Sequence, residues 1–155
     1  MPEGACKGDH QTMSRRDFSG RTSQAKAGFK RLKDAKRLRD QAGWRGAMYL
    51  AGYYIECKLK ARLMEMYNIW TLEELENRLS QRTGKSVRAF THSIEVLMTH
   101  TGAMKRMDDN VRRSFAKCNQ WKTDWRYDPS EGTMDECEAF IQAVETLGHF
   151  IDRNI

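Results

Sequence analysis

The sequence predicts an all-α protein, an up-down bundle of four main helices with one or two short extra helices. Three observations support this fold class. The chain contains only two prolines, Pro2 and Pro129, so residues 3–128 lack the residue that most reliably interrupts a helix. Four Val and six Ile are few for a β-sheet. Apolar residues also recur at three- and four-residue steps along most of the chain.

Length and composition indicate one globular domain without a membrane segment. The chain has 155 residues, of which 39% are hydrophobic, and single domains usually contain about 100–200 residues. No apolar run approaches the roughly 20 residues that cross a bilayer. The first eleven residues, MPEGACKGDHQ, lack the apolar stretch of a secretory signal. We therefore expect a cytoplasmic protein with no membrane contact.

The first part of the chain divides into an arm and two helices. Residues 1–22 are polar and charged, which predicts a disordered basic arm before a bundle over residues 23–155. A first helix is expected from about Ser23 to Asp40, and a second over about 44–67. The second helix is apolar on most sides, so it should lie at the centre of the bundle. The first helix has one apolar face, formed by Ala25, Gly28, Phe29, Leu32 and Ala35.

Capping signals and apolar repeats define the later helices. Capping boxes at Thr71/Glu74 and Thr133/Glu136 predict the start of a short third helix and of the last helix. Between them, apolar repeats predict one helix that includes Phe90 and ends at Gly102, and another over about 104–121. The segment WKTDWRYDPSEG, residues 121–132, is predicted to be a loop.

Positive charge is concentrated near the N-terminus. Residues 14–45 hold eleven Lys or Arg against three Asp, whereas the chain from Asp128 onward holds seven acids and one base. This asymmetry favours a polyanionic partner or electrostatic contacts between protomers, and a solvated helix face is the alternative. The candidate polyanion-binding residues are Lys26, Lys30, Lys33 and Arg37, with Arg15, Arg16 and Arg21 as additional contacts.

Two residues are candidates for acid–base and phosphate chemistry. His92 can exchange a proton near neutral pH, although a polar residue at the start of a helix is the simpler interpretation. Arg126 lies among Asp124, two aromatic rings and Pro129, a setting suited to bidentate phosphate recognition. The alternative for Arg126 is a structural ion pair with Glu56 or Asp124.

No metal or cofactor site is predicted. The four cysteines lie at least 19 residues apart and form no CxxC motif, and Cys57 and Cys137 fall on apolar helix faces as buried free thiols. Glycine-rich phosphate loops, HExxH and GxSxG are absent. Chemistry that depends on ATP, zinc or a nucleophilic serine is therefore not indicated.

Several segments together resemble the prokaryotic HEPN domain family, over about residues 23–151. They are AMYLAGYYIECKLKARL, THSIEVL, DWRYDP and TMDECEAFIQAVETLGHFID. The positions that match the family pattern are Glu56, Leu59 and Lys60 on the second helix, His92, Ile94 and Leu97 after it, and Arg126, Tyr127 and Pro129 in the loop.

The resemblance implies a bundle of four or five helices that forms a homodimer and acts in toxin–antitoxin or antiviral systems, often beside a nucleotidyltransferase. Ribonucleases of the family carry Arg, four to six residues and then His. Here no Arg stands five, six or seven positions before His92, His100 or His149. The sequence therefore favours a module that binds RNA, a nucleotide or a partner protein. A divergent metal-independent ribonuclease using His92 and Arg126, and a purely structural dimerisation partner, are the alternatives.

We also expect five polar residues to converge where the aromatic loop crosses the second and third helices. Glu56, Lys60, His92, Arg126 and Tyr127 are singled out both by local chemistry and by the resemblance. Glu56 and Lys60 are spaced to pair along one helix face. Because Glu56 interrupts an otherwise apolar surface, it is also the expected carboxylate partner of a buried Arg126.

Overall fold

A computed structural model describes residues 18–155 and confirms the all-α fold class. These residues form six α-helices and two short 3₁₀-helices, and they contain no β-strand, only an isolated bridge between Gly20 and Thr71. The helices are α1 (Arg21–Asp40), α2 (Trp44–Met66), α3 (Leu72–Thr83), α4 (Ile94–Thr101), η2 (Met104–Arg106), α5 (Asp109–Cys118), η3 (Thr123–Tyr127) and α6 (Met134–Asn154).

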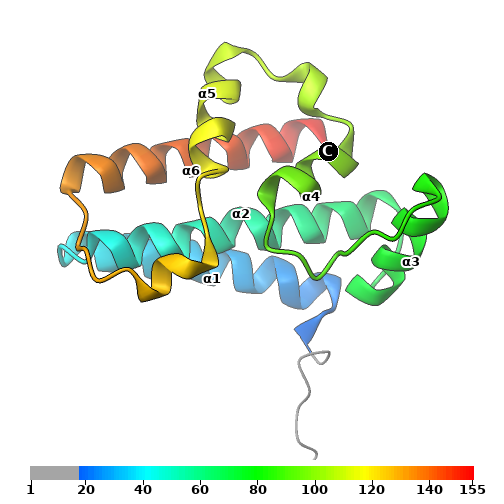
Figure 1. The fold of residues 1–155 in the computed structure, drawn as a ribbon, viewed down its shortest axis with the longest axis horizontal. Helices are drawn as coiled ribbons and strands as arrows, with labels where there is room; N and C mark the ends of the chain where they lie inside the picture. The colour runs from blue at the N-terminus through cyan, green and yellow to red at the C-terminus, as the bar shows by residue number, and fades with distance from the viewer. Residues whose placement is uncertain (1–17) are drawn as a thin grey trace, which may run out of the picture.

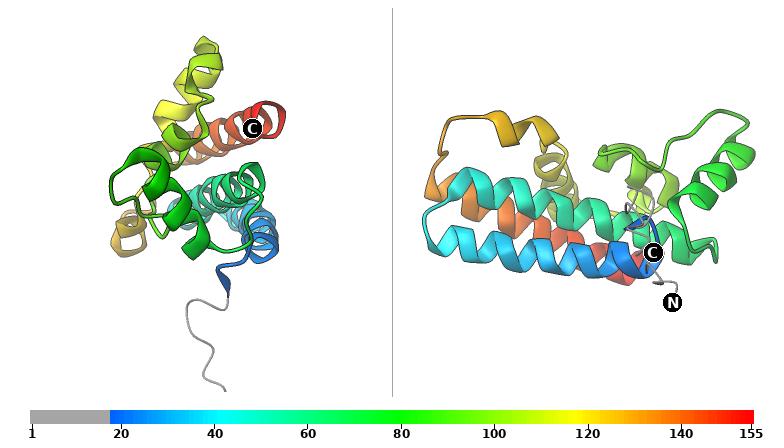
Figure 2. Two further views of the ribbon diagram at one scale, coloured as in Figure 1. Left: turned by 90° about the vertical axis from the view of Figure 1, so that its right-hand side faces the viewer. Right: turned by 90° about the horizontal axis from the view of Figure 1, so that it is seen from below.

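The three long helices lie side by side and form the body of the bundle. In Figures 1 and 2, α2 lies between α1 and α6, while α5 crosses α6 and α3 lies at the end of α2. As predicted, α2 is central, and most of its residues are buried. Ile55, Leu59 and Leu63 are completely enclosed. Burial of such side chains stabilises the fold by roughly 1.5–3 kcal/mol each.

Glycine allows α2 to approach both of its long neighbours closely. A Cβ atom at Gly28 of α1 would lie 3.2 Å from Cβ of Cys57. A Cβ atom at Gly148 of α6 would lie 2.7 Å from the Tyr54 hydroxyl. Each position therefore lets an α2 side chain pack directly against the backbone of the neighbouring helix.

Both predicted capping boxes are confirmed. The Thr71 hydroxyl accepts from the Glu74 backbone N–H at 3.2 Å, and the Glu74 carboxylate accepts in return from Thr71 N–H at 3.3 Å. Thr133 and Glu136 form the same pair of bonds at the start of α6. These bonds satisfy backbone donors that the first turn of a helix leaves without partners.

Some element boundaries differ from the prediction. Helix α1 begins at Arg21, and residues 18–20 are part of the fold, so the predicted arm over 1–22 is wrong for its last residues, while residues 1–17 lie outside the described part. The helix predicted over 104–121 is divided into η2 and α5 because Asp108 accepts from Val111 N–H and starts a new helix. The predicted loop contains η3.

Two aromatic residues assigned to apolar helix faces are exposed instead. Phe29 of α1 is 65% exposed, whereas Gly28 and Ala35 of the same predicted face are buried. Phe90 precedes α4, which begins at Ile94, and its side chain is 44% exposed. The repeat identified the correct helices in both regions but included one residue beyond the buried stripe.

Candidate functional site

A pocket of about 920 Å³ opens beside the middle of α2. Its wall combines aromatic, cationic and acidic side chains. It is lined by Phe18, Ser19, Gln24, Ala27, Arg31, Tyr49, Leu50, Tyr53, Glu56, Cys57, Lys60, Leu72, Phe90, His92, Thr123 and Arg126. The structure thus brings four of the five residues expected to converge, Glu56, Lys60, His92 and Arg126, to one cavity.

Glu56 connects the polar residues of this pocket. Its Oε1 accepts from Lys60 Nζ at 2.6 Å, and its Oε2 lies 2.9 Å from Nδ1 of His92. Glu56 is 3% exposed and Lys60 4%. The predicted pairing of Glu56 with Lys60 is confirmed. A buried carboxylate requires such a partner, because an isolated buried charge is strongly unfavourable.

His92 extends from this buried pair to the surface. It lies just before α4, whose N-cap is Ser93, and its side chain is 55% exposed. Because the Glu56 carboxylate accepts the hydrogen bond, a neutral His92 carries its proton on Nδ1 and leaves Nε2 as an acceptor. The ring also packs edge-on against Tyr53, with centroids 6.2 Å apart. His92 therefore has a fixed orientation and one ring nitrogen free of Glu56.

Two tyrosines form the adjacent wall. The Tyr49 and Tyr53 hydroxyls lie 3.1 Å apart. Burial, the Tyr49 hydrogen bond and the nearby Glu56 charge together raise the pKa of Tyr53, so it remains protonated at physiological pH. Trp121 supports this wall. Its Nε1 donates to the Tyr49 carbonyl at 3.0 Å, and its ring lies 4.8 Å from that of Tyr53.

Arg126 occupies the pocket rim and has no pairing with Glu56, so that predicted ion pair is wrong. Among residues 18–155 no ion pair joins Arg126 to Glu56 or Asp124, and Lys60 and His92 take both oxygens of Glu56 instead. The exposed guanidinium of Arg126 lies 4.7 Å from the centre of the Tyr127 ring. Tyr127 is also exposed and contacts the site through Arg126 rather than lining the cavity.

The four candidate polyanion-binding residues of α1, Lys26, Lys30, Lys33 and Arg37, are exposed but lie outside this pocket. Asp34 partly neutralises them, since it lies 3.1 Å from Lys30 and 3.7 Å from Arg37. Arg15 and Arg16 fall outside the described residues. Arg21 lines a different groove, between α1 and α2, together with Lys26.

Sequence reasoning missed Arg31, Tyr49 and Tyr53 as pocket residues. A usable signal was present on α2, because Tyr49, Tyr53, Glu56 and Lys60 follow one another at steps of four, three and four residues. That spacing places them on one face of a helix. Arg31 was not singled out because it lies within a run of basic residues, most of which face solvent.

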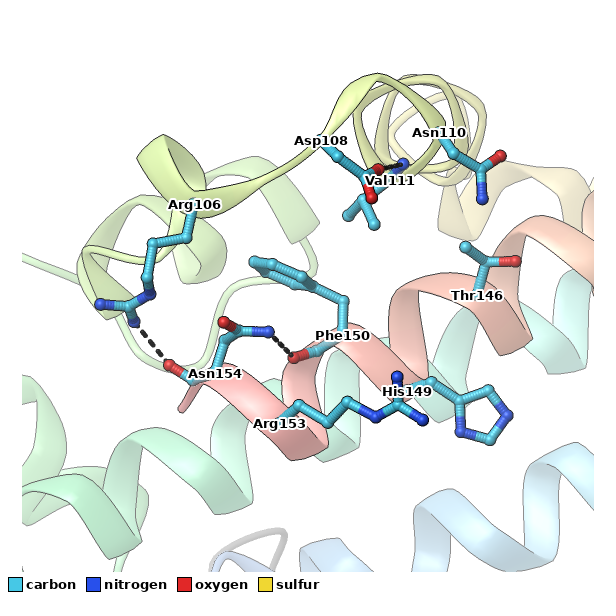
Figure 3. A pocket seen from close by; sticks show the side chains of 9 residues that line it. All are labelled: Arg106, Asp108, Asn110, Val111, Thr146, His149, Phe150, Arg153 and Asn154. Atoms are coloured by element: carbon cyan, nitrogen blue, oxygen red, sulfur yellow. Dashed lines mark hydrogen bonds between the residues drawn. The ribbon is translucent and has the colours of Figure 1, made fainter.

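A second pocket, of about 450 Å³, lies where η2 and α5 meet the end of α6 (Figure 3). The hydrogen bonds drawn in Figure 3 pair backbone groups near the ends of helices. Asp108 accepts from Val111 N–H, Arg106 donates to the Asn154 carbonyl, and the Asn154 amide donates to the Phe150 carbonyl. His149 also lines this pocket, whereas Glu56 and His92 line the α2 pocket. Because these three hydrogen bonds serve local structure, the α2 pocket is the stronger candidate.

The buried thiols agree with the prediction. Cys57 and Cys137 are free and buried, and burial raises the pKa of Cys57 to about 11.

Within residues 18–155 no group of three or more His, Cys, Asp or Glu side chains is placed to hold a metal ion. None of the described helices is both long and apolar enough to span a membrane. No known family model, curated protein or solved structure matches the chain.

Proposed function

We propose that the α2 pocket binds RNA or a nucleotide, and that the protein acts as a binding component of a prokaryotic toxin–antitoxin or antiviral defence system. The observation that carries the binding proposal is the grouping of the cations Arg31 and Arg126 with the tyrosines of α2 around one cavity. Cations bind phosphate, and aromatic rings stack on bases. The resemblance to HEPN proteins supports the biological setting.

The charge balance of the pocket favours an anion. Glu56 is the one acid among the lining residues, and Lys60 already neutralises it at 2.6 Å. Arg31 and Arg126 therefore supply positive charge that no carboxylate in the pocket wall offsets. Arg31 does lie 3.6 Å from Asp34, a half-buried contact that offsets its charge only partly, since Asp34 also lies near Lys30 and Arg37. A phosphate at the rim would thus meet net positive potential.

We propose that the exposed basic residues of α1, called the basic stripe, attract RNA to the protein surface rather than bind it in the pocket. Lys26, Lys30, Lys33 and Arg37 are exposed and outside the pocket. Such charges mainly raise the association rate, and their effect declines as salt screens them. Reversing Lys30 and Lys33 to Glu should therefore weaken retention on RNA at low salt. Unchanged retention would remove the stripe from the binding surface.

The binding proposal is tested by fluorescence anisotropy with a labelled RNA over a salt series. Affinity should fall steeply as salt rises, because phosphate contacts release counterions. Arg126→Ala and Arg31→Ala should each weaken binding and reduce the salt slope by about one. Arg113→Ala is the matched control, since Arg113 is an exposed cation of α5 outside the pocket. Absence of salt-dependent binding, or equal losses in the control, would overturn the proposal.

Metal-independent RNA cleavage is the second candidate, and the Glu56–His92 contact favours it. Glu56 orients the imidazole through Nδ1, so Nε2 could accept a proton from a ribose 2′-hydroxyl. Arg126, on the same pocket wall, would then stabilise the negative charge that develops on the phosphate. In this scheme the 2′-oxygen attacks the adjacent phosphorus to form a 2′,3′-cyclic phosphate, and the 5′-oxygen of the next nucleotide leaves with a proton taken from water, while His92 returns its proton to the solvent.

Cleavage and binding are separated by one variant. His92→Ala should retain RNA binding and the melting temperature while abolishing cleavage and any growth arrest on expression. A wild-type protein that neither cleaves RNA nor arrests growth would exclude the enzyme. Cleavage that persists in His92→Ala would exclude this mechanism.

Homodimerisation, and association with a nucleotidyltransferase or another defence protein, are proposed from the resemblance. Light scattering at micromolar concentration should show a species of twice the 18.1 kDa chain mass. A purely monomeric species would contradict the dimer. Co-purification with the product of a neighbouring gene would test the second association.

A further inference from the structure

Two exposed phenylalanine rings line the α2 pocket, and phosphate binding alone does not account for them. Phe18 is 57% exposed and Phe90 is 44% exposed, yet both contribute to the cavity wall. They come from distant parts of the chain, since Phe18 precedes α1 and Phe90 lies between α3 and α4. Large apolar side chains left in water around a cavity mark a surface that another molecule covers.

The backbone at each ring is anchored by a side chain from a helix. Glu76 of α3 accepts from the backbone N–H groups of Ala89 and Phe90, at 2.8 and 3.2 Å. On the other side, the Gln24 amide donates to the Phe18 carbonyl at 2.9 Å. Both rings are therefore presented from fixed main chain, which lowers the entropy that a ligand would lose on contacting them.

Two cations line the same cavity as these rings. Arg31 and Arg126 contribute to its wall together with Phe18 and Phe90. Stacking rings interleaved with cations form the usual surface for unpaired nucleotides, because every base has an aromatic face and every linkage has a charge. In a duplex the faces of the bases are already covered by their neighbours, so such rings would have nothing to stack on.

We propose that Phe18 and Phe90 are base-stacking residues of the pocket and give it a preference for unpaired nucleotides within a strand. This inference rests on the proposed function and narrows its ligand. The cations hold the phosphates in any polyanion, whereas the two rings discriminate between a single strand and ligands without accessible bases.

The test compares labelled single-stranded RNA, a duplex of the same sequence, AMP and polyphosphate in equilibrium binding. Wild type should bind the single strand most tightly. Phe90→Ala and Phe18→Ala should each lose about tenfold in affinity for the strand and should bind polyphosphate as wild type does. Phe90→Trp should restore strand binding, because tryptophan also stacks. Phe29→Ala is the matched control, since Phe29 is exposed on α1 but lies outside this pocket.

The possible outcomes distinguish a failure of the base-stacking inference from a failure of the proposed RNA binding. Equal affinity for strand and duplex, or strand binding that is unchanged in both alanine variants, would overturn the stacking role while leaving RNA binding intact. Affinity for AMP equal to that for the strand would overturn the strand preference. No binding of any of these polyanions would refute the proposed function itself.

Discussion

Oε2 of Glu56 lies 2.9 Å from Nδ1 of the half-exposed His92, although Glu56 itself is buried in the centre of α2. The second oxygen of the carboxylate is held by Lys60. Glu56 therefore connects the interior of the bundle to the pocket, and its two hydrogen bonds fix the rotamer through which His92 is oriented. Changes at Glu56 should affect both stability and the site.

Replacing Glu56 with Gln should destabilise the fold strongly. The amide keeps the shape of the side chain but leaves Lys60 buried without a countercharge. Breaking a buried pair in this way costs about 3–5 kcal/mol, which urea denaturation followed by circular dichroism measures. The control is Glu65→Gln, because Glu65 pairs with Arg62 at 2.9 Å on the surface. That change should remain within about 1 kcal/mol. Equal small losses would indicate that Lys60 reaches water.

Gly52→Ala should disturb the aromatic wall of the pocket. A Cβ atom at Gly52 would lie 2.2 Å from the Trp121 ring, so Trp121 must shift and its contact with Tyr53 must change. Overpacking of this kind costs typically about 1–3 kcal/mol. Gly46→Ala in the same helix is the matched control, since its Cβ would lie 3.4 Å from a flexible Leu38 methyl group. It should be neutral or stabilising by up to about 1 kcal/mol. Tryptophan fluorescence and denaturation distinguish the two variants, and equal stability would contradict the predicted clash.

Asp152 should make stability depend on acid pH. Partial burial raises its pKa, but the hydrogen bonds from Lys58 and Arg62, at 2.7 and 3.0 Å, outweigh burial and leave the pKa below the ordinary value of 3.8. A carboxyl whose folded pKa is lowered stabilises the protein above its unfolded pKa, and this contribution is lost as pH falls through the folded value. The stability difference between wild type and Asp152→Asn should therefore shrink as pH is lowered below about 4. A constant difference across that range would contradict the linkage.

Cys57 and Cys118 should resist alkylation in the folded protein. Burial raises the pKa of Cys57 to about 11 and that of Cys118 to about 12, and the reactive species is the thiolate. In a Cys6→Ser background, mass spectrometry after iodoacetamide treatment near pH 8 should show little labelling of either thiol. Full labelling in urea provides the control. Rapid native labelling of Cys57 would show that reagents reach its thiol from the α2 pocket that it lines.

The sequence predicted which segments form helices. It did not predict where some of the helices begin and end, or that two of the aromatic side chains are exposed. The capping boxes located the starts of α3 and α6 because those signals are local. Periodicity assigned Phe29 and Phe90 to apolar faces, yet both are exposed. A repeat gives the angular position of a residue on its own helix, but burial depends on whether a neighbouring element covers that position.

The candidate site was predictable to a similar degree. Glu56, Lys60, His92 and Arg126 were selected by local chemistry together with the resemblance to HEPN proteins, and all four line one cavity. Of the two cations predicted to pair with Glu56, Lys60 does so and Arg126 does not. Lys60, one turn away on the same helix, is positioned by helix geometry alone, whereas Arg126 depends on the path of η3. The spacing of residues along the chain therefore does not predict where a loop side chain lies in the folded protein.

The segment before α1 is joined to the start of α3 by main-chain bonds. Arg21 N–H donates to the Trp70 carbonyl at 2.9 Å, and Leu72 N–H donates to the Ser19 carbonyl at 3.2 Å. The α1–α2 hairpin is thus a closed loop of chain whose two ends meet beside Phe18 and Leu72, on the wall of the pocket. A ligand that binds Phe18 would therefore reduce the motion of the residues that close the loop. Through them, it would lower the tendency of both ends of the α1–α2 hairpin to unfold locally.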